Sequence, residues 1–422
     1  MKKTEQKYQA FVQILKEELI PAMGCTEPIS LAYGASIARK VLNHLPTKIV
    51  VEASGSIIKN VKSVIVPHTH HLKGIKAAVC AGIIGGNDDK YLEVLSQIDE
   101  KTKKEIDQYI EKVDFEEHFL DSSKVFDYII TVWNKKEYVK VRISDSHMHV
   151  VCIEKNGQIL QEEKSVVKKE KADRSLLDIK DIYDFIKTVE LTDIQDILER
   201  QIDYNYAIAC AGLNDNYGAN IGKVLLKSFG NDVKNKAKAY AAAGSDARMN
   251  GCELPVVISG SGNQGMTCSL PVIIYAQELK VSKEKMLRAV ALSNLVAIHE
   301  KSGIGTLSAY CGAVSAATGA GAGIAYLYDE DYQAVIHTIV NTLANVSGIV
   351  CDGAKASCAA KIASSVDAAI LGYHMYKNGQ EFKSGDGLVM ENVEATIQSV
   401  GRLGREGMRE TNKEIIKMMI HE

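Results

Sequence analysis

The sequence predicts an α+β protein: a large, mostly α-helical domain rich in Gly and Ala helices, joined to a smaller α+β module with a short antiparallel sheet. Two observations lead to this fold class. Short β-rich runs are confined to the stretch from about 46 to 194. From about 195 to 422, segments with helical spacing alternate with Gly-rich breaks. A chain of 422 residues is long enough for two or three domains of about 150 residues each.

The first 45 residues have helical character. Residues 8–20 show helical spacing and end at Pro21, and a second helix is expected over 30–45. Because this helical pattern matches that of the C-terminal part, we expect residues 1–45 to pack with the C-terminal domain. The loop between the two helices would carry Cys25.

Residues 46–194 are expected to form the α+β module. A strand is expected at 48–53 and an apolar helix at 74–84. Asn156-Gly157 is typical of a tight hairpin turn. Three β-rich runs with turn residues between them are expected to build the antiparallel sheet: 125–133, 138–144 and 147–154.

Residues 195–422 are expected to form the helical domain. Gly lowers the intrinsic stability of a helix, so close packing between these helices must compensate. The segment 306–328 carries no formal charge and is long enough to span a membrane, but small residues dominate it in place of Leu and Ile. We therefore expect it inside a soluble core, with no membrane partner. The expected helices are 231–243, 265–279, 282–301, 306–328, 331–350 and 355–376.

Composition argues against several classes of protein. With 46% hydrophobic and 24% charged residues, the chain can bury a large core and lacks the bias of a disordered protein. A net charge of −3 without a dense Lys/Arg block gives no reason to expect nucleic acid as a partner. The N-terminal segment lacks the apolar run of a signal peptide, so we expect a cytoplasmic protein.

Nine cysteines are spread over the whole chain. An odd number without dense spacing does not fit the disulfide framework of a small secreted domain. Cys25, Cys311 and Cys351 lie in polar or Gly-rich surroundings, and folding could gather them around a soft metal centre, since thiolates favour iron–sulfur clusters and zinc. The other cysteines outside such surroundings are expected in the core, where free Cys is common: Cys80, Cys152, Cys210, Cys252 and Cys268.

Residues 259–265 (SGSGNQG) follow an apolar run and precede a helix. They contain a literal G-x-G-x-x-G, but a dinucleotide site needs a second strand ending in Asp or Glu about 20 residues later. Residues 279–283 are instead the seam between two helices, which argues against a nucleotide-binding oxidoreductase. Free backbone N–H groups at a helix N-terminus suit an anion such as a carboxylate. A tight turn that needs glycines is the structural alternative.

Two further motifs are less specific. The C-x₆-C spacing of residues 351–358 (CDGAKASC) is neither a ferredoxin run nor a zinc pair, and a helix–helix turn with two buried thiols would explain it. His68, His70 and His71 form a cluster with no Cys or carboxylate in ligand spacing. A loop with exposed imidazoles is favoured there over a metal site.

Taken together, five motifs in order resemble one family, the L-cysteine desulfidases, which are related to the α chain of the bacterial iron–sulfur L-serine dehydratases. The similarity extends through nearly the whole chain. The motifs are MGCTEP at 23–28, SGSIIKN at 54–60, SGSGNQG at 259–265, Cys311-Gly312 and CDGAKASC at 351–358.

The resemblance implies an enzyme that has a [4Fe-4S] cluster, needs no pyridoxal phosphate (PLP) and eliminates a β-substituent from a small L-amino acid. L-Cysteine would give pyruvate, ammonia and hydrogen sulfide. Carried over to this chain, the cluster ligands are Cys25, Cys311 and Cys351, with Cys358 as a substitute, and 195–422 is the catalytic domain. Three thiolates leave one iron with an open position, where it can act as a Lewis acid.

The remaining roles are assigned from position and chemistry. Lys355 lies four residues after Cys351, and a desolvated lysine can serve as a base; a surface lysine at a helix start is the structural alternative. Glu27, two residues from Cys25, is the competing acid/base candidate. Substrate-binding residues are expected in two of the motifs: Ser259, Ser261, Gly262, Asn263, Gln264, Lys59 and Asn60.

Two other functions stay open at this point. One is an L-serine dehydratase with the same cluster and a harder leaving group. The other is a non-catalytic iron–sulfur sensor, in which Cys358 would complete a four-thiolate site. The expected partner is a small amino acid, and we allow for a homodimer. The cluster of His68, His70 and His71 is a departure from the family, in which Gly is expected.

Overall fold

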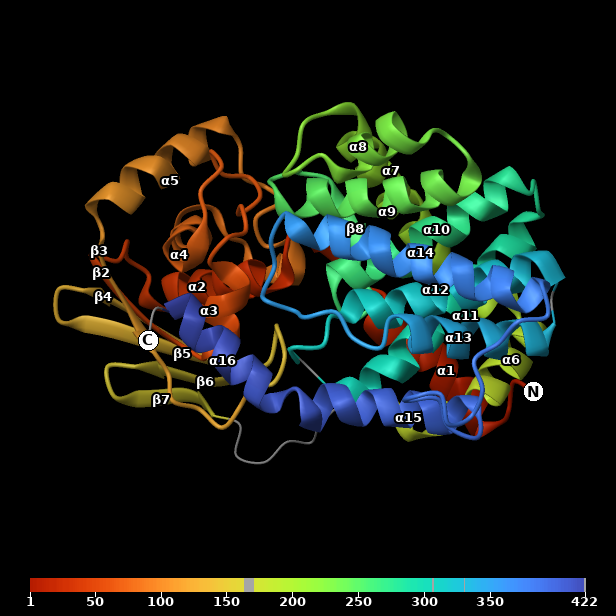
Figure 1. Ribbon diagram of the computed structural model, residues 1–422. Helices are drawn as coiled ribbons and strands as arrows, with labels where there is room; N and C mark the ends of the chain where they lie inside the picture. The colour runs from red at the N-terminus through yellow and green to blue at the C-terminus, as the bar shows by residue number, and fades with distance from the viewer. Residues whose placement is uncertain (163–170, 306, 330, 421–422) are drawn as a thin grey trace.

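The computed structural model describes residues 1–162, 171–305, 307–329 and 331–420. It confirms the α+β class with a large helical part. Figure 1 shows this helical part on the right and a sheet with its own helices on the left.

The main sheet is larger than expected, and it is mixed rather than antiparallel. Its strands are β2 (Lys48–Ala53), β3 (Asp114–Phe119), β4 (Asp127–Asn134), β5 (Glu137–Ser144), β6 (Val150–Lys155) and β7 (Gln158–Glu162). They lie in the order β3-β2-β4-β5-β6-β7, and β2 pairs with β3 in parallel. The long helical connection between these two strands makes the parallel return possible. The edge strand β3 was not expected because its sequence, DFEEHF, is polar and largely exposed.

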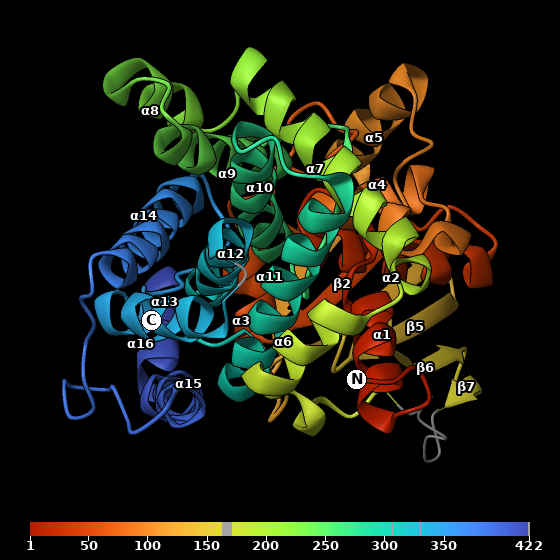
Figure 2. The same ribbon diagram turned by 90° about the vertical axis from the view of Figure 1, so that its right-hand side faces the viewer.

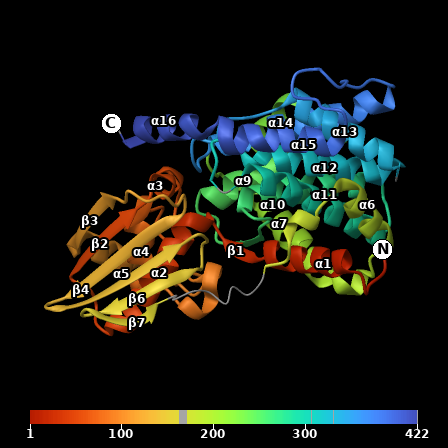
Figure 3. The ribbon, with the colours of Figure 1, turned by 90° about the horizontal axis from the view of Figure 1, so that it is seen from below.

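Helix α2 (Thr26–Leu42) lies against this sheet. It packs on β4, β5 and α4 (Gly74–Gly85), and Figure 3 shows it beside the strands. A Cβ on Gly82 would lie 2.2 Å from the carbonyl oxygen of Ala32, so this glycine allows the two helices to touch along their backbones. α2 begins earlier than expected, directly after Cys25, and this residue is its N-cap. The other helices of this part are α3 (Gly55–Val61) and α5 (Glu100–Lys112).

The N-terminal helices divide between the two parts of the molecule. Helix α1 (Gln6–Glu18) packs against α6 (Ile179–Thr188) and α11 (Lys283–Ile304), whereas α2 belongs to the sheet. Between them, β1 (Pro21–Met23) pairs antiparallel with β8 (Pro255–Val257). Within residues 1–45, α1 therefore packs with the helices of the C-terminal part, whereas α2 packs with the sheet. We propose a helical domain of residues 1–24 and 171–420 and a sheet module of residues 25–162.

The helical part is built around α12 (Gly312–Asp329). This helix packs against α10, α11, α13 and α14, as Figure 2 shows. It begins after the expected position, and Thr306 lies outside the described residues. Among the described residues, no helix is long and apolar enough to cross a membrane. The remaining helices are α7 (Gln195–Asn214), α8 (Ile221–Phe229), α9 (Val233–Met249), α10 (Gly262–Glu278), α13 (Tyr332–Asn345), α14 (Ser357–Lys377), α15 (Val393–Arg402) and α16 (Arg409–Ile420).

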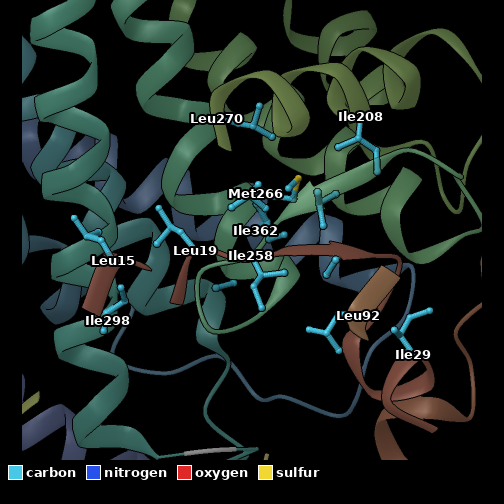
Figure 4. Packing of buried hydrophobic residues seen from close by; sticks show 14 of the residues in the cluster. Leu15, Leu19, Ile29, Leu92, Ile208, Ile258, Met266, Leu270, Ile298 and Ile362 are labelled. Atoms are coloured by element: carbon cyan, nitrogen blue, oxygen red, sulfur yellow. The ribbon is translucent and has the colours of Figure 1, made fainter. Parts of the chain in front are cut away.

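One hydrophobic core is shared by both parts. Leu15 and Ile298 of the helical part belong to the same buried cluster as Ile29 and Leu92 of the sheet module. Figure 4 shows these side chains together with others of the cluster. Since apolar burial is the main force that holds elements together, the two parts are fixed against one another.

Helix α12 offers a matched test of its close packing. A Cβ on Gly319 would lie 2.3 Å from the carbonyl oxygen of Ser293, which is backbone and cannot move alone, whereas a Cβ on Gly321 meets methyl groups at 3.0 and 3.1 Å. We expect Gly319→Ala to lower the free energy of unfolding by about 1–3 kcal/mol, and Gly321→Ala to lower it less. Urea denaturation of both variants checks this; equal effects would contradict the packing argument.

Candidate functional site

A cavity of about 130 Å³ lies where the sheet module meets the helical part. The N-terminus of α2, the β5–β6 connection, the N-terminus of α10, the C-terminus of α11 and the segments before α12 and α14 all reach it. Its lining is mostly polar side chains and thiols: Cys25, Thr26, Glu27, Asn60, His147, Arg248, 260–264, Lys301, Leu307, Ser308, 310–313, Cys351, Gly353, Ala354, Cys358 and Ile362.

Four free thiols reach this cavity, those of Cys25, Cys311, Cys351 and Cys358. All but Cys351 are buried, and Cys351 is half-buried. Among the described residues, no three His, Cys, Asp or Glu side chains lie close enough to bind a single metal ion. The thiols therefore surround the cavity from several directions and do not converge on one point.

Five other cysteines were expected in the core. Cys80, Cys252 and Cys268 are buried as expected. Cys152 and Cys210 are only half-buried, a correction to that expectation. Neither residue lines the cavity.

Cys311 and Cys351 are held together by the backbone. The amide of Cys311 donates to the carbonyl of Ile349 at 2.8 Å, and the amide of Cys351 donates to that of Ala309 at 2.6 Å. The hydrogen bond from the Cys311 thiol lowers the pKa of Cys351 against the effect of burial, and it raises the pKa of Cys311.

The Cys25 loop needs a glycine before the thiol. Gly24 has a φ of +56°, and a Cβ there would lie 2.9 Å from the ring of Pro67. The Arg248 guanidinium donates from Nη1 to the carbonyl of Gly24 at 2.8 Å. The loop is thus tied to α9, and Cys25 is directed into the cavity.

The Cys351 loop lies against helix α3. Gly353 has a φ of +93°, and a Cβ there would lie 2.3 Å from the carbonyl oxygen of Lys59. The buried ammonium of Lys59 donates to the side chain of Asn412 at 2.8 Å and to the carbonyl of Cys351 at 3.4 Å. Burial lowers the pKa of Lys59, and Cys351 and Glu27 oppose that shift. Lys59 therefore supports the loop from behind and does not line the cavity.

The glycine-rich loop enters the cavity as expected, with Ser261, Gly262, Asn263 and Gln264 on its wall. Ser261 is the N-cap of α10, and its hydroxyl accepts the amide of Gln264. Among the residues that the structure describes after α10, no second parallel strand occurs, and α10 is followed by α11. Ser259 is buried behind the wall and does not line the cavity.

Glu27 and Asn60 form a buried pair inside the cavity. Asn60 Nδ2 donates to Glu27 Oε1 at 3.1 Å, and Glu27 Oε2 accepts from Cys25 Sγ at 3.2 Å and from Thr26 Oγ1 at 3.1 Å. Burial opposes ionisation of Glu27, but the charge of His147 and these hydrogen bonds lower its pKa. The cavity therefore contains a carboxyl group in direct contact with a thiol.

Lys355 lies near the cavity but not on its wall. Its ammonium lies 2.5 Å from the carboxylate of Asp352 and donates to the backbone carbonyl of that residue at 2.7 Å. The structure brings Lys301 to the cavity instead. Burial lowers the pKa of Lys301, against the opposing effect of Cys351 and Cys311.

Three residues that line the cavity were not predicted from the sequence: Lys301, His147 and Arg248. Lys301 lies in the last turn of α11, and Gly303 and Gly305 follow it closely, a signal that could have drawn attention to it. His147 follows β5 in a turn, and Arg248 ends an Ala-rich helix, so neither had a distinctive local pattern. All three depend on tertiary contacts for their place in the site.

Buried polar atoms without a hydrogen-bond partner gather around this cavity. Such an atom is costly unless a ligand or water satisfies it. The arrangement therefore suits a small ligand with both donors and acceptors. On the cavity wall these atoms are Asn60 Oδ1, His147 Nε2, Arg248 Nε, Gln264 Nε2 and the Tyr310 hydroxyl oxygen.

The histidine loop differs in part from the expectation of exposed imidazoles. His70 and His71 are exposed, and His70 Nδ1 lies 2.5 Å from the carboxylate of Asp107. His68 is buried, which corrects the expectation for that residue. None of the three lines the cavity.

Comparison with known proteins supports the motif-based resemblance. A family model described as the serine dehydratase alpha chain matches residues 89–417. The chain belongs to the serine dehydratase alpha-chain family. Within that family match lie Cys311, Cys351 and the glycine-rich loop, whereas Cys25 and Glu27 precede it.

Relatives extend this similarity to the N-terminal part. A UPF0597 protein of Desulfitobacterium hafniense is 55% identical over 425 residues, covering 100% of this chain and 99% of that protein. A UPF0597 protein of Lachnoclostridium phytofermentans is 50% identical, covering 98% and 100%. One from Treponema denticola is 44% identical, covering 98% of each. Similarity to these UPF0597 proteins thus spans every segment that reaches the cavity.

Gly353 and Gly385 provide a matched pair for the Cys351 loop. Both have positive φ, +93° and +97°, but a Cβ on Gly385 meets nothing within 4 Å. We expect Gly385→Ala to cost about 1–2 kcal/mol in unfolding free energy from backbone strain, and Gly353→Ala to cost more because the loop must leave α3.

Urea denaturation measures the two costs. In the same samples, we expect Cys351 to react faster with iodoacetamide in Gly353→Ala than in Gly385→Ala. Equal stability losses and equal alkylation rates would show that the contact with Lys59 does not position this loop.

Proposed function

We propose that this protein is an iron–sulfur-dependent lyase that removes the β-substituent of a small L-amino acid, most readily L-cysteine, to give pyruvate, ammonia and hydrogen sulfide. Membership of the serine dehydratase alpha-chain family supports a lyase of this general kind. The observation that carries the proposal is the arrangement of Cys25, Cys311 and Cys351 around the same small cavity as the glycine-rich loop.

The residues present fit a [4Fe-4S] cluster. In such a cluster each cysteine binds a different iron, so the ligands need not meet at the distance of a single-ion site. Cys25, Cys311 and Cys351 are free thiols from three separate segments. The buried ammonium groups of Lys59 and Lys301 can balance the negative charge of bound thiolates. Held by three thiolates, the cluster would supply a Lewis acid for the leaving group.

The glycine-rich loop is suited to hold the substrate. Ser261, Gly262, Asn263 and Gln264 present the first turn of α10, where free N–H groups and the helix dipole favour the substrate carboxylate. Asn60 Oδ1 lacks a partner and can accept from the substrate ammonium group. Since Ser259 and Lys59 lie behind the wall, we assign them to support of the loops instead of direct contact with substrate.

Glu27 is the residue we favour for removal of the Cα proton. Its carboxylate faces the cavity, and one of its oxygens accepts the Cys25 thiol. A cysteine that binds metal does so as a thiolate, so this oxygen would lose that donor and become free to accept a proton. Lys355 is less suitable because its ammonium is engaged by Asp352.

The proposed reaction begins with transfer of the Cα proton to Glu27. The β-substituent leaves with the electron pair of its bond to Cβ, as hydrosulfide from cysteine. The resulting aminoacrylate tautomerises to an imine, which water hydrolyses to pyruvate and ammonia. PLP is not needed. We also propose that the protein acts in the cytoplasm, where thiols stay reduced.

L-Serine is the second candidate substrate, since the matching family is described as the serine dehydratase alpha chain. The test is an anaerobic assay after reconstitution with iron and sulfide, with excess sulfide removed, in which L-cysteine and L-serine are offered separately. We expect pyruvate and an equal amount of sulfide from L-cysteine. Pyruvate from L-serine at a comparable or higher rate would make the protein a dehydratase. No pyruvate from either substrate, with the cluster fully loaded, would refute the lyase.

Cysteine variants test the ligand set. We expect Cys25→Ser, Cys311→Ser and Cys351→Ser each to lose the visible absorption of the cluster and all activity, because each removes one thiolate. Cys268→Ser is the control, since Cys268 is buried but does not line the cavity. Cys358→Ser is expected to keep the cluster; loss of it there would indicate four thiolate ligands and favour a sensor.

Two variants distinguish the role of Lys301, which lines the cavity, from that of Lys355, which does not. We expect Lys301→Met to reduce turnover by roughly 100-fold, because it removes a buried positive charge from the cavity. Lys355→Met is expected to stay within about twofold of the wild type, as for a side chain that only pairs with a partly exposed carboxylate. Cluster absorbance is measured in both. A larger loss of turnover in Lys355→Met than in Lys301→Met would instead indicate that Lys355 is the catalytic lysine.

A further inference from the structure

The guanidinium of Arg248 is a buried charge without an acidic partner. The residue is 3% exposed and lines the cavity. Its hydrogen bonds to the carbonyl of Gly24 and to Asn263 Oδ1 use Nη1 and Nη2, and its Nε has no partner. Among the described residues, no Asp or Glu pairs with it. A buried charge left in this state is costly, which points to an anion that the protein takes up.

Other arginines of this chain show the contrast. Arg142 pairs with Asp127, Arg174 pairs with Glu17 and Glu18, and Arg288 pairs with Glu284. Each of these is more exposed than Arg248. Arg248 is thus more deeply buried than these three arginines and lacks the carboxylate partner that each of them has.

The first turn of helix α10 lies directly against this guanidinium. A Cβ on Gly262 would lie 2.3 Å from Nη1, 2.5 Å from Cζ and 2.6 Å from Nε of Arg248. Only a glycine leaves room for the guanidinium beside the helix N-terminus. The free N–H groups of that turn and the charge of Arg248 therefore meet on the same side of the cavity, where both attract an anion.

We propose that Arg248 binds the α-carboxylate of the substrate and makes the site selective for free amino acids over their amides and esters. This inference rests on the proposed function, because it assumes an amino acid in this cavity. Arginine suits a carboxylate because its planar N–H groups match the two oxygens.

The test uses a ligand that binds without reacting. L-Alanine has the carboxylate and ammonium groups of the substrate but no β-leaving group, and L-alaninamide replaces the carboxylate by a neutral amide. Isothermal titration of cluster-loaded, anaerobic wild-type protein is expected to show roughly 100-fold tighter binding of L-alanine than of L-alaninamide. We expect Arg248→Gln to remove this preference and Arg248→Lys to restore part of it, with cluster absorbance retained.

Two further variants make the test specific. Arg174→Gln is the matched control, because this arginine already has two carboxylate partners outside the cavity, and we expect it to keep the preference. Gly262→Ala leaves the arginine in place but displaces its guanidinium, and we expect weaker binding of L-alanine with the cluster retained. In turnover of L-cysteine, Arg248→Gln should raise KM more than it lowers kcat.

The outcomes separate the two proposals. If wild-type protein turns over L-cysteine or L-serine and Arg248→Gln still prefers L-alanine to its amide, the carboxylate role of Arg248 is wrong and the lyase stands. Loss of the cluster in both Arg248→Gln and Arg248→Lys would also contradict the carboxylate role, because the charge of Arg248 would then balance the cluster thiolates. If L-alanine binds with the expected dependence on Arg248 but neither amino acid reacts, the lyase is wrong and the binding site stands.

Discussion

The central constraint in this structure is the burial of positive charge beside thiols. Arg248 and Lys301 line one small cavity, Lys59 lies behind its wall, and burial lowers the pKa of both lysines. Cations in such a place must be balanced by anions or the fold loses stability. Thiolates, the ionised Glu27 and a substrate carboxylate are the groups that can balance them. The chemistry of the site and the stability of its walls thus depend on the same charges.

Close backbone contacts bring these charges together. Gly24, Gly262 and Gly353 each allow a neighbouring group to approach to a distance that a Cβ would prevent. The neighbours are Pro67, the Arg248 guanidinium and the Lys59 carbonyl, and they belong to segments far away in the sequence. Glycines at these positions are therefore part of the construction of the site and not simple loop residues.

Much of the fold could be predicted from local pattern. Helical spacing predicted most helices of the second half, and apolar runs predicted β2, β4 and β5 closely. Strand β3 could not be predicted, since a polar edge strand has no apolar signal. The division of residues 1–45 also escaped prediction, because helical spacing does not show which elements α1 and α2 pack against.

The parts of the site that lie in a sequence motif could be predicted. The loops of Cys25, Cys311 and Cys351 and the glycine-rich loop were all expected, and all reach the cavity. Lys355 was favoured because it is close to Cys351 in sequence, yet the turn directs its ammonium to Asp352. His147 and Arg248 come from elements with no chemical signature of their own, so only the tertiary structure could reveal them.

The site also joins segments from nearly the whole length of the chain. Cys25 near the N-terminus faces Cys358, and Asn412 of helix α16 holds Lys59 behind the Cys351 loop. Contacts between residues so far apart in the sequence form slowly, because a long loop must close before they can stabilise the fold. In a growing chain on the ribosome, the Cys351 loop therefore lacks the support of Asn412 until α16 has emerged. A metal centre held by Cys25, Cys311 and Cys351 would tie together segments that only folding brings close.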